Sequence, residues 1–437
     1  MTTIDRFDPF EQRITAAIDE IAAPRRPDYL DDILRQTART SQRPRWTFPE
    51  RWLHMDTAVP RSSLARRLPV QSLVLLIILA LIAVAATAVW VGSQRRVPPP
   101  FGPAANGSIA YTANGDIYVR EALDAQPRLL LGGPGDDAYP FYSPDGRRFA
   151  FSTTIDGKEY LKVADADGSN ARQLLPDPLI GASAYWMPDS AALGVVTEIS
   201  SLPKLLIVPV DGSEPRAIDL GTSVPLGDAV PRPPDGRQLI LRVQQPDGHI
   251  DLMTVDPITG QTHALGIPGD LLFGIDYEAS GPVWSPDGSR IAYNRVEPAP
   301  SGDEPSGRFS VHLVNPDGTG DRAMPAPADD AVQEGWPLFS PDGRSILVHR
   351  WTWKSSGGGE GWLAVLPADG SAAATDIGPR IPGGEDTGLI KTWSPDGSRV
   401  LVRAENEQKV YSIDPATGDY EELPWTTELP DWQRVSP

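Results

Sequence analysis

The sequence predicts an all-β propeller, and three observations support this fold class. A Ser-Pro-Asp-Gly tetrapeptide begins at Ser143, Ser285, Ser340 and Ser394, and degenerate copies begin at Met187 and Pro233. The Asp positions of successive copies lie 44 to 55 residues apart, as between Asp145 and Asp189 or between Asp287 and Asp342. Short apolar segments bounded by Gly, Pro, Asn and Asp fill each interval. Periods of about 40 to 50 residues with strand-like content are typical of propellers with one blade per repeat.

Each repeat is organised around the tetrapeptide, which is a turn. Pro presets φ at the first corner, Asp bonds its own backbone, and Gly accepts a positive φ. The residues directly before the turn are Tyr142, Trp186, Trp284, Phe339 and Trp393, with Arg232 as the exception. After it come an apolar strand such as Ile291–Tyr293, a polar loop, a third strand, a second turn such as Asn315–Gly318, and a fourth strand. This order predicts antiparallel blades of four strands.

The two ends of the repeat region decide the number of blades. Residues 108–131 contain the second, third and fourth strands of a blade that lacks its first strand. Residues 432–437 resemble a first strand with no blade after it. If this C-terminal strand completes the N-terminal blade, the ring closes over residues 107–437, and closure removes exposed sheet edges that invite aggregation. Seven blades are therefore favoured, and six remain the alternative.

These repeats resemble the TolB-type family of WD-repeat-like propellers over residues 107–437. The matching residues belong to turns and to the core, so the resemblance is specific for the fold and not for the function. Members of such families include periplasmic scaffolds, surface proteins and the propeller halves of oligopeptidases. The TolB members are six-bladed and soluble, so a seventh blade and a membrane anchor would both depart from them.

Residues 69–93 are expected to form a single transmembrane helix. Leu73–Val91 is a run of 19 residues without a charge, which is long enough for the roughly 30 Å hydrocarbon core. It begins too far along the chain for a signal peptide. Residues 1–68 contain 12 Arg, so the positive-inside rule places the N-terminus in the cytoplasm. We expect a cell-membrane protein whose extracytoplasmic propeller is joined to the helix by a stiff Pro-rich linker, residues 94–106.

Residues 1–68 are expected to form a small cytoplasmic head of two or three short helices. Asp8 and Pro9 suit the start of a helix, and Ile14 and Ile18 fall on one face of it. The layout of a short head, one span and an exported domain resembles membrane-bound anti-sigma factors, although their frequent His-Cys-Cys zinc motif is absent. The head is interpreted either as an anchor with its own small core or as a docking module for a cytoplasmic partner.

Composition excludes several classes of function. The chain of 437 residues has no Cys and a formal net charge of −19, so disulfides, thiol catalysis and zinc–thiolate sites are excluded. Residues 97–437 hold 25 basic and 48 acidic residues, a net charge of −23. A propeller this acidic is not expected to bind nucleic acid.

No motif for catalysis, a cofactor or a metal is recognisable. The chain lacks a Gly-x-Ser-x-Gly elbow, a His-Glu-x-x-His pair and a Gly-x-x-x-x-Gly-Lys loop, and its five His occur singly. Asp165–Asn170 resembles the start of a calcium loop, but Pro176 stands where a bidentate Glu is required. We therefore expect no cofactor, no metal and no enzymatic activity.

Loop lengths indicate where a partner would bind. Loops between second and third strands lie on the same face as the blade-to-blade loops, opposite the Ser-Pro-Asp-Gly turns. Three long loops, residues 266–281, 297–308 and 352–361, should cluster on one sector of that face. The candidate partner-binding residues are Asp276, Tyr277, Glu278, Glu297, Asp303, Glu304, Trp351 and Trp353. Exposed aromatic and charged residues suit a partner surface, whereas in the alternative reading Trp351 and Trp353 pack within the sheet.

The predicted function is protein–protein recognition or scaffolding by a membrane-anchored extracytoplasmic propeller, with sensing relayed to the cytoplasmic head as an extension. The alternative is a carbohydrate-binding or glycosidase-like propeller enzyme. Acidic groups together with Trp suit sugars, and two carboxylates about 5 to 10 Å apart would support glycosidase chemistry. A protein partner is thus expected, and a carbohydrate ligand is the alternative.

Overall fold

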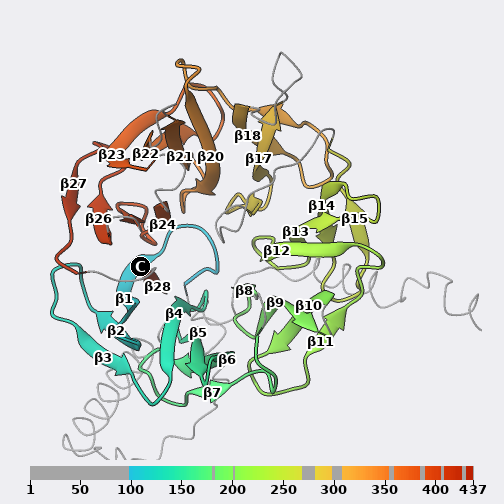
Figure 1. Cartoon of the computed structure of the whole chain (residues 1–437), viewed down its shortest axis with the longest axis vertical. Coiled ribbons are helices and arrows are strands. Elements are labelled where there is room, and N and C mark those ends of the chain that lie inside the picture. Colours follow the sequence, from blue (N-terminus) through green and yellow to red (C-terminus); the bar gives the residue numbers. More distant parts are fainter. Residues whose placement is uncertain are drawn as a thin grey trace, which may run out of the picture. The chain divides into compact units, whose positions relative to one another are not determined.

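The fold is a ring of seven four-stranded antiparallel sheets, seen along the ring axis in Figure 1. The computed structural model describes residues 98–436 apart from 180–182, 200–201, 268–280, 298–307, 354–358, 384–388, 405–407 and 426–429. None of the described residues is helical. Seven blades are therefore confirmed, and the six-bladed alternative is excluded.

Every blade runs from an innermost to an outermost strand in chain order, except the one that closes the ring. The innermost strands are β28 (Asp431–Val435), β4 (Asp136–Tyr142), β8 (Ser183–Trp186), β12 (Val224–Pro231), β16 (Val283–Trp284), β20 (Val332–Phe339) and β24 (Leu389–Trp393). The second strands are β1 (Ala105–Ala113), β5 (Arg148–Ile155), β9 (Ala192–Ile199), β13 (Leu239–Gln244), β17 (Ile291–Glu297), β21 (Ser345–Trp353) and β25 (Val400–Ala404). The third strands are β2 (Asp116–Arg120), β6 (Lys158–Asp165), β10 (Leu202–Pro209), β14 (Ile250–Val255), β18 (Arg308–Val314), β22 (Gly359–Pro367) and β26 (Lys409–Ile413). The outermost strands are β3 (Arg128–Leu131), β7 (Arg172–Gln173), β11 (Arg216–Ile218), β15 (Thr262–Ala264), β19 (Arg322–Ala323), β23 (Thr375–Pro382) and β27 (Tyr420–Glu422).

The ring closes with strands from both ends of the repeat region, as the sequence predicts. Strand β28 pairs antiparallel with β1, with Ile109 opposite Trp432 and Ala105 opposite Val435. The C-terminal strand therefore supplies the innermost position of the blade whose other strands are β1, β2 and β3. Closure of this kind gives the inner edge of β1 a partner, which would otherwise be an exposed edge that invites aggregation.

Adjacent blades are joined by a buried apolar layer and by the Trp residues before the turns. One such layer packs Ile240 and Leu252 of one blade against Trp284 and Tyr293 of the next. The indole of Trp284 also donates a hydrogen bond to Val230 O over 3.0 Å. The aromatic position before the turn thus fills the interface between blades and satisfies a backbone carbonyl there.

The turn glycines lie against the preceding blade. Gly288 has a φ of 68°, and a Cβ at this position would lie 2.1 Å from Pro233 O. Gly146 has a φ of 66°, and its Cβ would lie 2.1 Å from Arg434 O. Only glycine combines the positive φ with so close an approach of two backbones.

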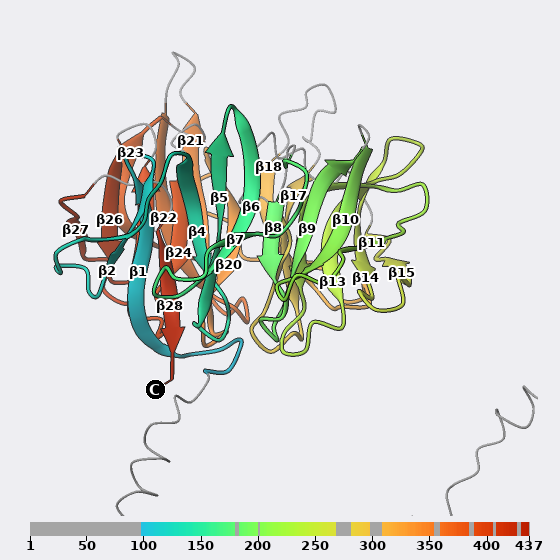
Figure 2. The ribbon, with the colours of Figure 1, turned by 90° about the horizontal axis from the view of Figure 1, so that it is seen from below.

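The predicted head and span, residues 1–68 and 69–93, lie outside the described residues and stay predictions. Within the described part of the chain, no helix has the length and apolar character needed to cross a membrane. The described end of the predicted linker, residues 98–104, follows the face that carries the Ser-Pro-Asp-Gly turns, which we call the turn face (Figure 2). Pro98 and Ala104 are buried there, so this part of the linker is packed against the propeller.

Candidate functional site

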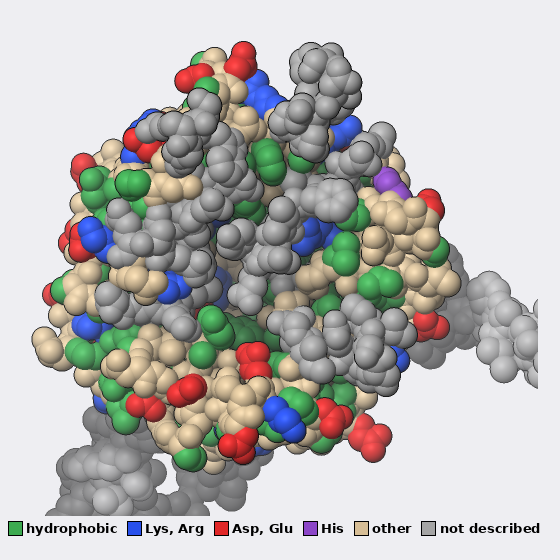
Figure 3. Space-filling model, in the orientation of Figure 1, with side chains coloured by type: hydrophobic (Ala, Val, Ile, Leu, Met, Phe, Trp, Pro, Cys, Tyr) green, Lys and Arg blue, Asp and Glu red, His purple; other side chains and the backbone are tan. Residues whose placement is uncertain are grey.

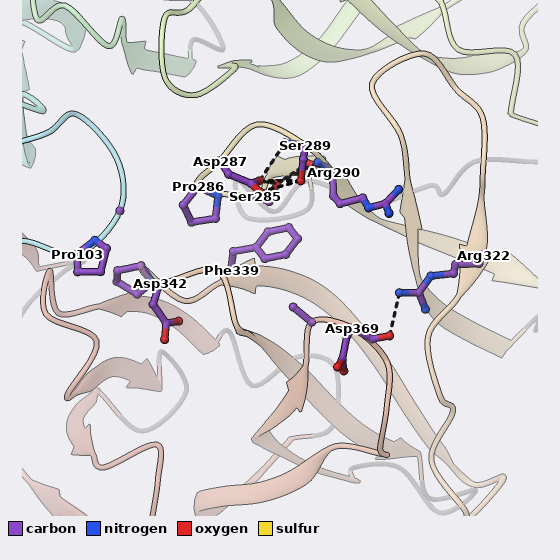
Figure 4. A pocket seen from close by; sticks show the side chains of 14 residues that line it. Pro103, Ser285, Pro286, Asp287, Ser289, Arg290, Arg322, Phe339, Asp342 and Asp369 are labelled. Atoms are coloured by element: carbon purple, nitrogen blue, oxygen red, sulfur yellow. Dashed lines mark hydrogen bonds between the residues drawn. The ribbon is translucent and has the colours of Figure 1, made fainter.

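A cleft of about 630 Å³ lies on the turn face between the blade of β16–β19 and the blade of β20–β23. The turns that begin at Ser285 and Ser340 form two of its walls, and Pro103 of the linker lies at its edge (Figure 4). Its remaining side chains of note are Phe339, Arg290, Arg322 and Asp369. The volume lies within the range of about 300 to 1,000 Å³ that is usual for ligand sites.

The turn carboxylates in the cleft are engaged by their own turns. Ser285 Oγ donates to Asp287 Oδ1 over 2.6 Å, and Ser289 N donates to the same oxygen over 3.0 Å. Burial opposes ionisation of Asp287, but the hydrogen bonds from Ser285 and Ser289 outweigh it and lower the pKa. Asp342 is held in the same way by Ser340 Oγ. These carboxylates stabilise the turns and are poorly placed to act as acids or bases.

The cleft also presents two guanidinium groups. Arg322 Nη2 donates to Asp369 O over 3.1 Å, and Arg290 Nη1 donates to Asn315 Oδ1. Neither arginine forms an ion pair within the described part of the chain. An open cleft of turns, prolines and arginine donors offers contacts that suit a polypeptide surface.

Three innermost strands contain a register shift with a residue at positive φ. Tyr139 in β4 has a φ of 53°, Trp336 in β20 has 51°, and Gly227 in β12 has 76°. The Tyr139 amide donates to Thr112 Oγ1 over 3.1 Å, and the Trp336 amide donates to Asn294 Oδ1 over 2.8 Å. Both acceptors belong to the preceding blade. Positive φ is easily adopted by Gly but is strained for a bulky aromatic residue.

Tyr139 and Trp336 differ in the surroundings of their rings. Trp336 is 8% exposed, stacks on His349 with ring centroids 5.0 Å apart, and lies 4.6 Å from the Trp351 ring. Its packing offsets the backbone strain. Tyr139 is 49% exposed, so much less of its ring contributes to packing. Strained residues gather at functional sites and Tyr is frequent among binding hot spots, which makes Tyr139 a candidate contact residue.

Sequence reasoning did not single out Tyr139, although a signal is present. Both strained aromatic residues directly precede a proline, as Tyr139-Pro140 and Trp336-Pro337. Proline cannot donate to the hydrogen bonds of a sheet and is therefore confined to edges and bulges. An aromatic–proline pair shortly before a turn could thus have marked these bulges.

A second unusual group on an innermost strand is Lys391 in β24. It forms no hydrogen bond or ion pair within the residues that the structure describes, and desolvation lowers the pKa of its ammonium to about 8. His349 in the neighbouring blade is 3% exposed. Burial, together with the positive charge of Lys391, lowers the pKa of His349 well below its usual value, so this imidazole is neutral. Amines with a lowered pKa are frequent at binding and catalytic sites.

Of the residues predicted from the loops, Trp351 is the one whose side chain the structure describes. It is fully buried and contacts the Phe309 ring with centroids 5.1 Å apart, as the packing alternative proposed. Strands β17 and β21 reach Glu297 and Trp353, but the positions of those two side chains are not described. The remaining candidates, Asp276, Tyr277, Glu278, Asp303 and Glu304, lie outside the described residues.

The segment that resembles a calcium loop is a hydrogen-bonded turn. Asn170 Nδ2 donates to Asp165 Oδ2 over 2.7 Å, and Ser169 N donates to Asp167 Oδ1 over 2.9 Å. Among the residues with described positions, no group of three or more acidic or His side chains is arranged to hold a metal ion.

Comparisons with known proteins identify the fold. No protein-family profile matches the chain, and no curated protein matches its sequence. An oligogalacturonate lyase in complex with manganese is 17% identical, with a TM-score of 0.52 over 75% of this chain and 85% of the lyase. A puromycin hydrolase is 17% identical, with a TM-score of 0.51 over 77% of this chain and 55% of the hydrolase. TolB from Acinetobacter baumannii is 15% identical, with a TM-score of 0.46 over 76% of this chain and 81% of TolB.

The chain is thus a β-propeller with TolB among its structural neighbours. The expectation that it has no enzymatic activity is contradicted, because the solved propellers that resemble it include a lyase and a hydrolase. The absence of known motifs was a poor guide, because function depends on the geometry of a site and one fold hosts many functions. At these identities the likeness defines the fold alone, and neither activity is transferred to this chain.

Proposed function

We propose that the protein recognises a protein partner through its propeller, as a membrane-anchored extracytoplasmic module. The observation that carries this proposal is Tyr139, a strained and half-exposed aromatic residue on an innermost strand. In β12 a glycine, Gly227, occupies the corresponding positive-φ position. The backbone conformation alone would favour glycine at both positions, so the tyrosine side chain has a role beyond the backbone, and a half-exposed aromatic ring suits a contact with a partner. The uncharged run Leu73–Val91 supports the anchor.

Site-specific photo-crosslinking tests this proposal. The photo-reactive residue p-benzoylphenylalanine would replace Tyr139 in the full chain in its native membrane. Tyr420 is the matched control position, because it is 52% exposed but lies on the outermost strand β27. We expect a discrete crosslinked protein band from position 139 and none from position 420. Equal labelling from both positions would contradict a recognition site at Tyr139.

A second candidate function is the binding or cleavage of an acidic carbohydrate, and Lys391 favours it. A cation without an ion-pair partner in the described structure suits a carboxylate-bearing sugar. Two oligogalacturonate lyases are among the similar folds, so oligogalacturonate is a suitable probe. Calorimetric titration and product analysis with this probe would compare the protein with Lys391→Met. Binding or cleavage that is lost in Lys391→Met would favour this function, and no signal from either protein would remove it.

A further inference from the structure

The described end of the linker, residues 98–104, forms a strap across the turn face. Figure 2 shows this segment following the underside of the propeller to the start of β1. Its Ala104 N donates to Pro395 O over 2.9 Å, in the turn between β24 and β25. Gly102 and Pro103 of the strap line the cleft on the same face (Figure 4). The strap therefore contacts turns from blades other than the one it enters.

The strap is also bound by the strand that closes the ring. Arg434 Nη2 in β28 donates to Pro99 O over 3.2 Å and to Gly102 O over 2.6 Å. Arg434 Nε is buried and has no hydrogen-bond partner among the described residues. Loss of the strap would leave further donors of this partly buried guanidinium without acceptors, which is unfavourable.

Strand β28 is held in turn by both of its neighbours. Asn106 and Arg434 are paired across β1 and β28. On the other side, Gln433 Nε2 donates to Gly146 O over 2.7 Å, and Asp431 Oδ2 accepts from Tyr142 N over 2.6 Å. A single arginine on β28 thus connects the ring closure to the segment that leads to the N-terminal part of the chain.

We propose that the docked strap and the paired strand β28 stabilise each other, so that release of either one loosens the other. Thermodynamic linkage makes this coupling reciprocal. The strap continues directly into the residues before Pro98. The inference does not depend on what the propeller binds, because it rests only on contacts within the propeller.

Hydrogen exchange with mass spectrometry on the full chain in detergent tests the coupling from both ends. Pro98→Gly loosens the strap at a buried residue that is not part of β28. Arg434→Met removes the guanidinium donors that bind the strap but keeps much of the apolar part of the side chain. Arg237→Met is the control, because Arg237 is exposed at the turn before β13 and its side chain pairs with Asp235 of the same turn. We expect at least tenfold faster exchange in both Phe101–Asn106 and Asp431–Val435 for the first two variants, and wild-type rates for Arg237→Met.

Two results would overturn the proposal. One is a wild-type exchange rate in Phe101–Asn106 for either Pro98→Gly or Arg434→Met, because the strap would then be held by other contacts. The other is faster exchange of the strap in Pro98→Gly with a wild-type rate in β28. Pro98→Gly decides the coupling even if Arg434→Met fails to fold, since it leaves every side chain of β28 in place.

Discussion

The indole nitrogen of Trp284 donates to the carbonyl oxygen of Val230, 54 residues earlier and in the preceding blade. Trp186 makes the same bond to Phe141 O over 3.1 Å, and Trp393 makes it to Leu338 O over 3.4 Å. The aromatic residue before the turn therefore joins successive blades by a recurring polar contact as well as by its bulk. Its loss leaves a backbone acceptor of the interface without its partner.

Trp284→Phe is expected to lower the free energy of unfolding by about 1 to 3 kcal/mol, since it removes this bond and part of a buried ring. Trp393→Phe is the matched comparison and should lower the free energy of unfolding by less, because the hydrogen bond of Trp393 is longer and its side chain is only partly buried. Chemical denaturation of the two variants measures the difference. Equal losses would mean that ring volume alone matters.

Tyr139→Gly is expected to keep or raise the free energy of unfolding, by up to about 1 kcal/mol, because it relieves a positive φ at a half-exposed residue. Tyr420→Gly, at similar exposure but ordinary φ, should lower it by about 0.5 to 1 kcal/mol. Denaturation midpoints check both values. A larger loss for Tyr139→Gly than for Tyr420→Gly would show that the tyrosine is retained for folding, and the recognition proposal would lose its support.

Gly288→Ala is expected to destabilise the propeller by about 1 to 3 kcal/mol, because its Cβ would lie 2.1 Å from Pro233 O at a φ of 68°. Gly343→Ala has nearly the same φ, 69°, but its nearest contact is a proline side-chain atom at 3.4 Å. Gly343→Ala should therefore lower the free energy of unfolding only by the cost of placing alanine at a positive φ. Thermal unfolding of the pair separates backbone strain from the collision between blades.

Asp431 makes the stability of the ring closure depend on pH. Desolvation raises its pKa from 3.8 to about 6, against the opposing hydrogen bond from Tyr142 N. Because the folded-state pKa lies above the unfolded value, the protonated carboxyl of Asp431 favours the folded state. Its contribution to the free energy of unfolding is complete below pH 4 and is lost as the pH rises through 6. Asp431→Asn should remove this dependence and increase stability at pH 8 by about 2 to 3 kcal/mol. Unfolding curves between pH 4 and 8 test this, and an unchanged slope in the variant would exclude Asp431 as its source.

Much of the fold could be predicted because one local signal repeats. The Ser-Pro-Asp-Gly turns predicted the blades. The unmatched strands at residues 108–131 and 432–437 predicted the closure of the ring with seven blades. The candidate site was less accessible to sequence reasoning. A tryptophan such as Trp351 looks the same in a sequence whether it is exposed or fully buried. The positive φ of Tyr139 is accompanied by a hydrogen bond from its amide to Thr112 in another blade. Such features depend on contacts between distant segments, which no local pattern records.

The closing strand β28 also determines when, during synthesis of the chain, the ring can close. Ser108 of β1 is hydrogen-bonded to Gln433 of β28 across 325 residues, so the inner edge of β1 has no partner until these 325 residues have been synthesised. At about 5 to 20 residues per second this interval is on the order of tens of seconds. During it, β1 presents open hydrogen-bonding groups of the kind that recruit other strands. Nascent chains of this protein should therefore be most vulnerable to aggregation and proteolysis just before β28 emerges, and most dependent then on chaperones.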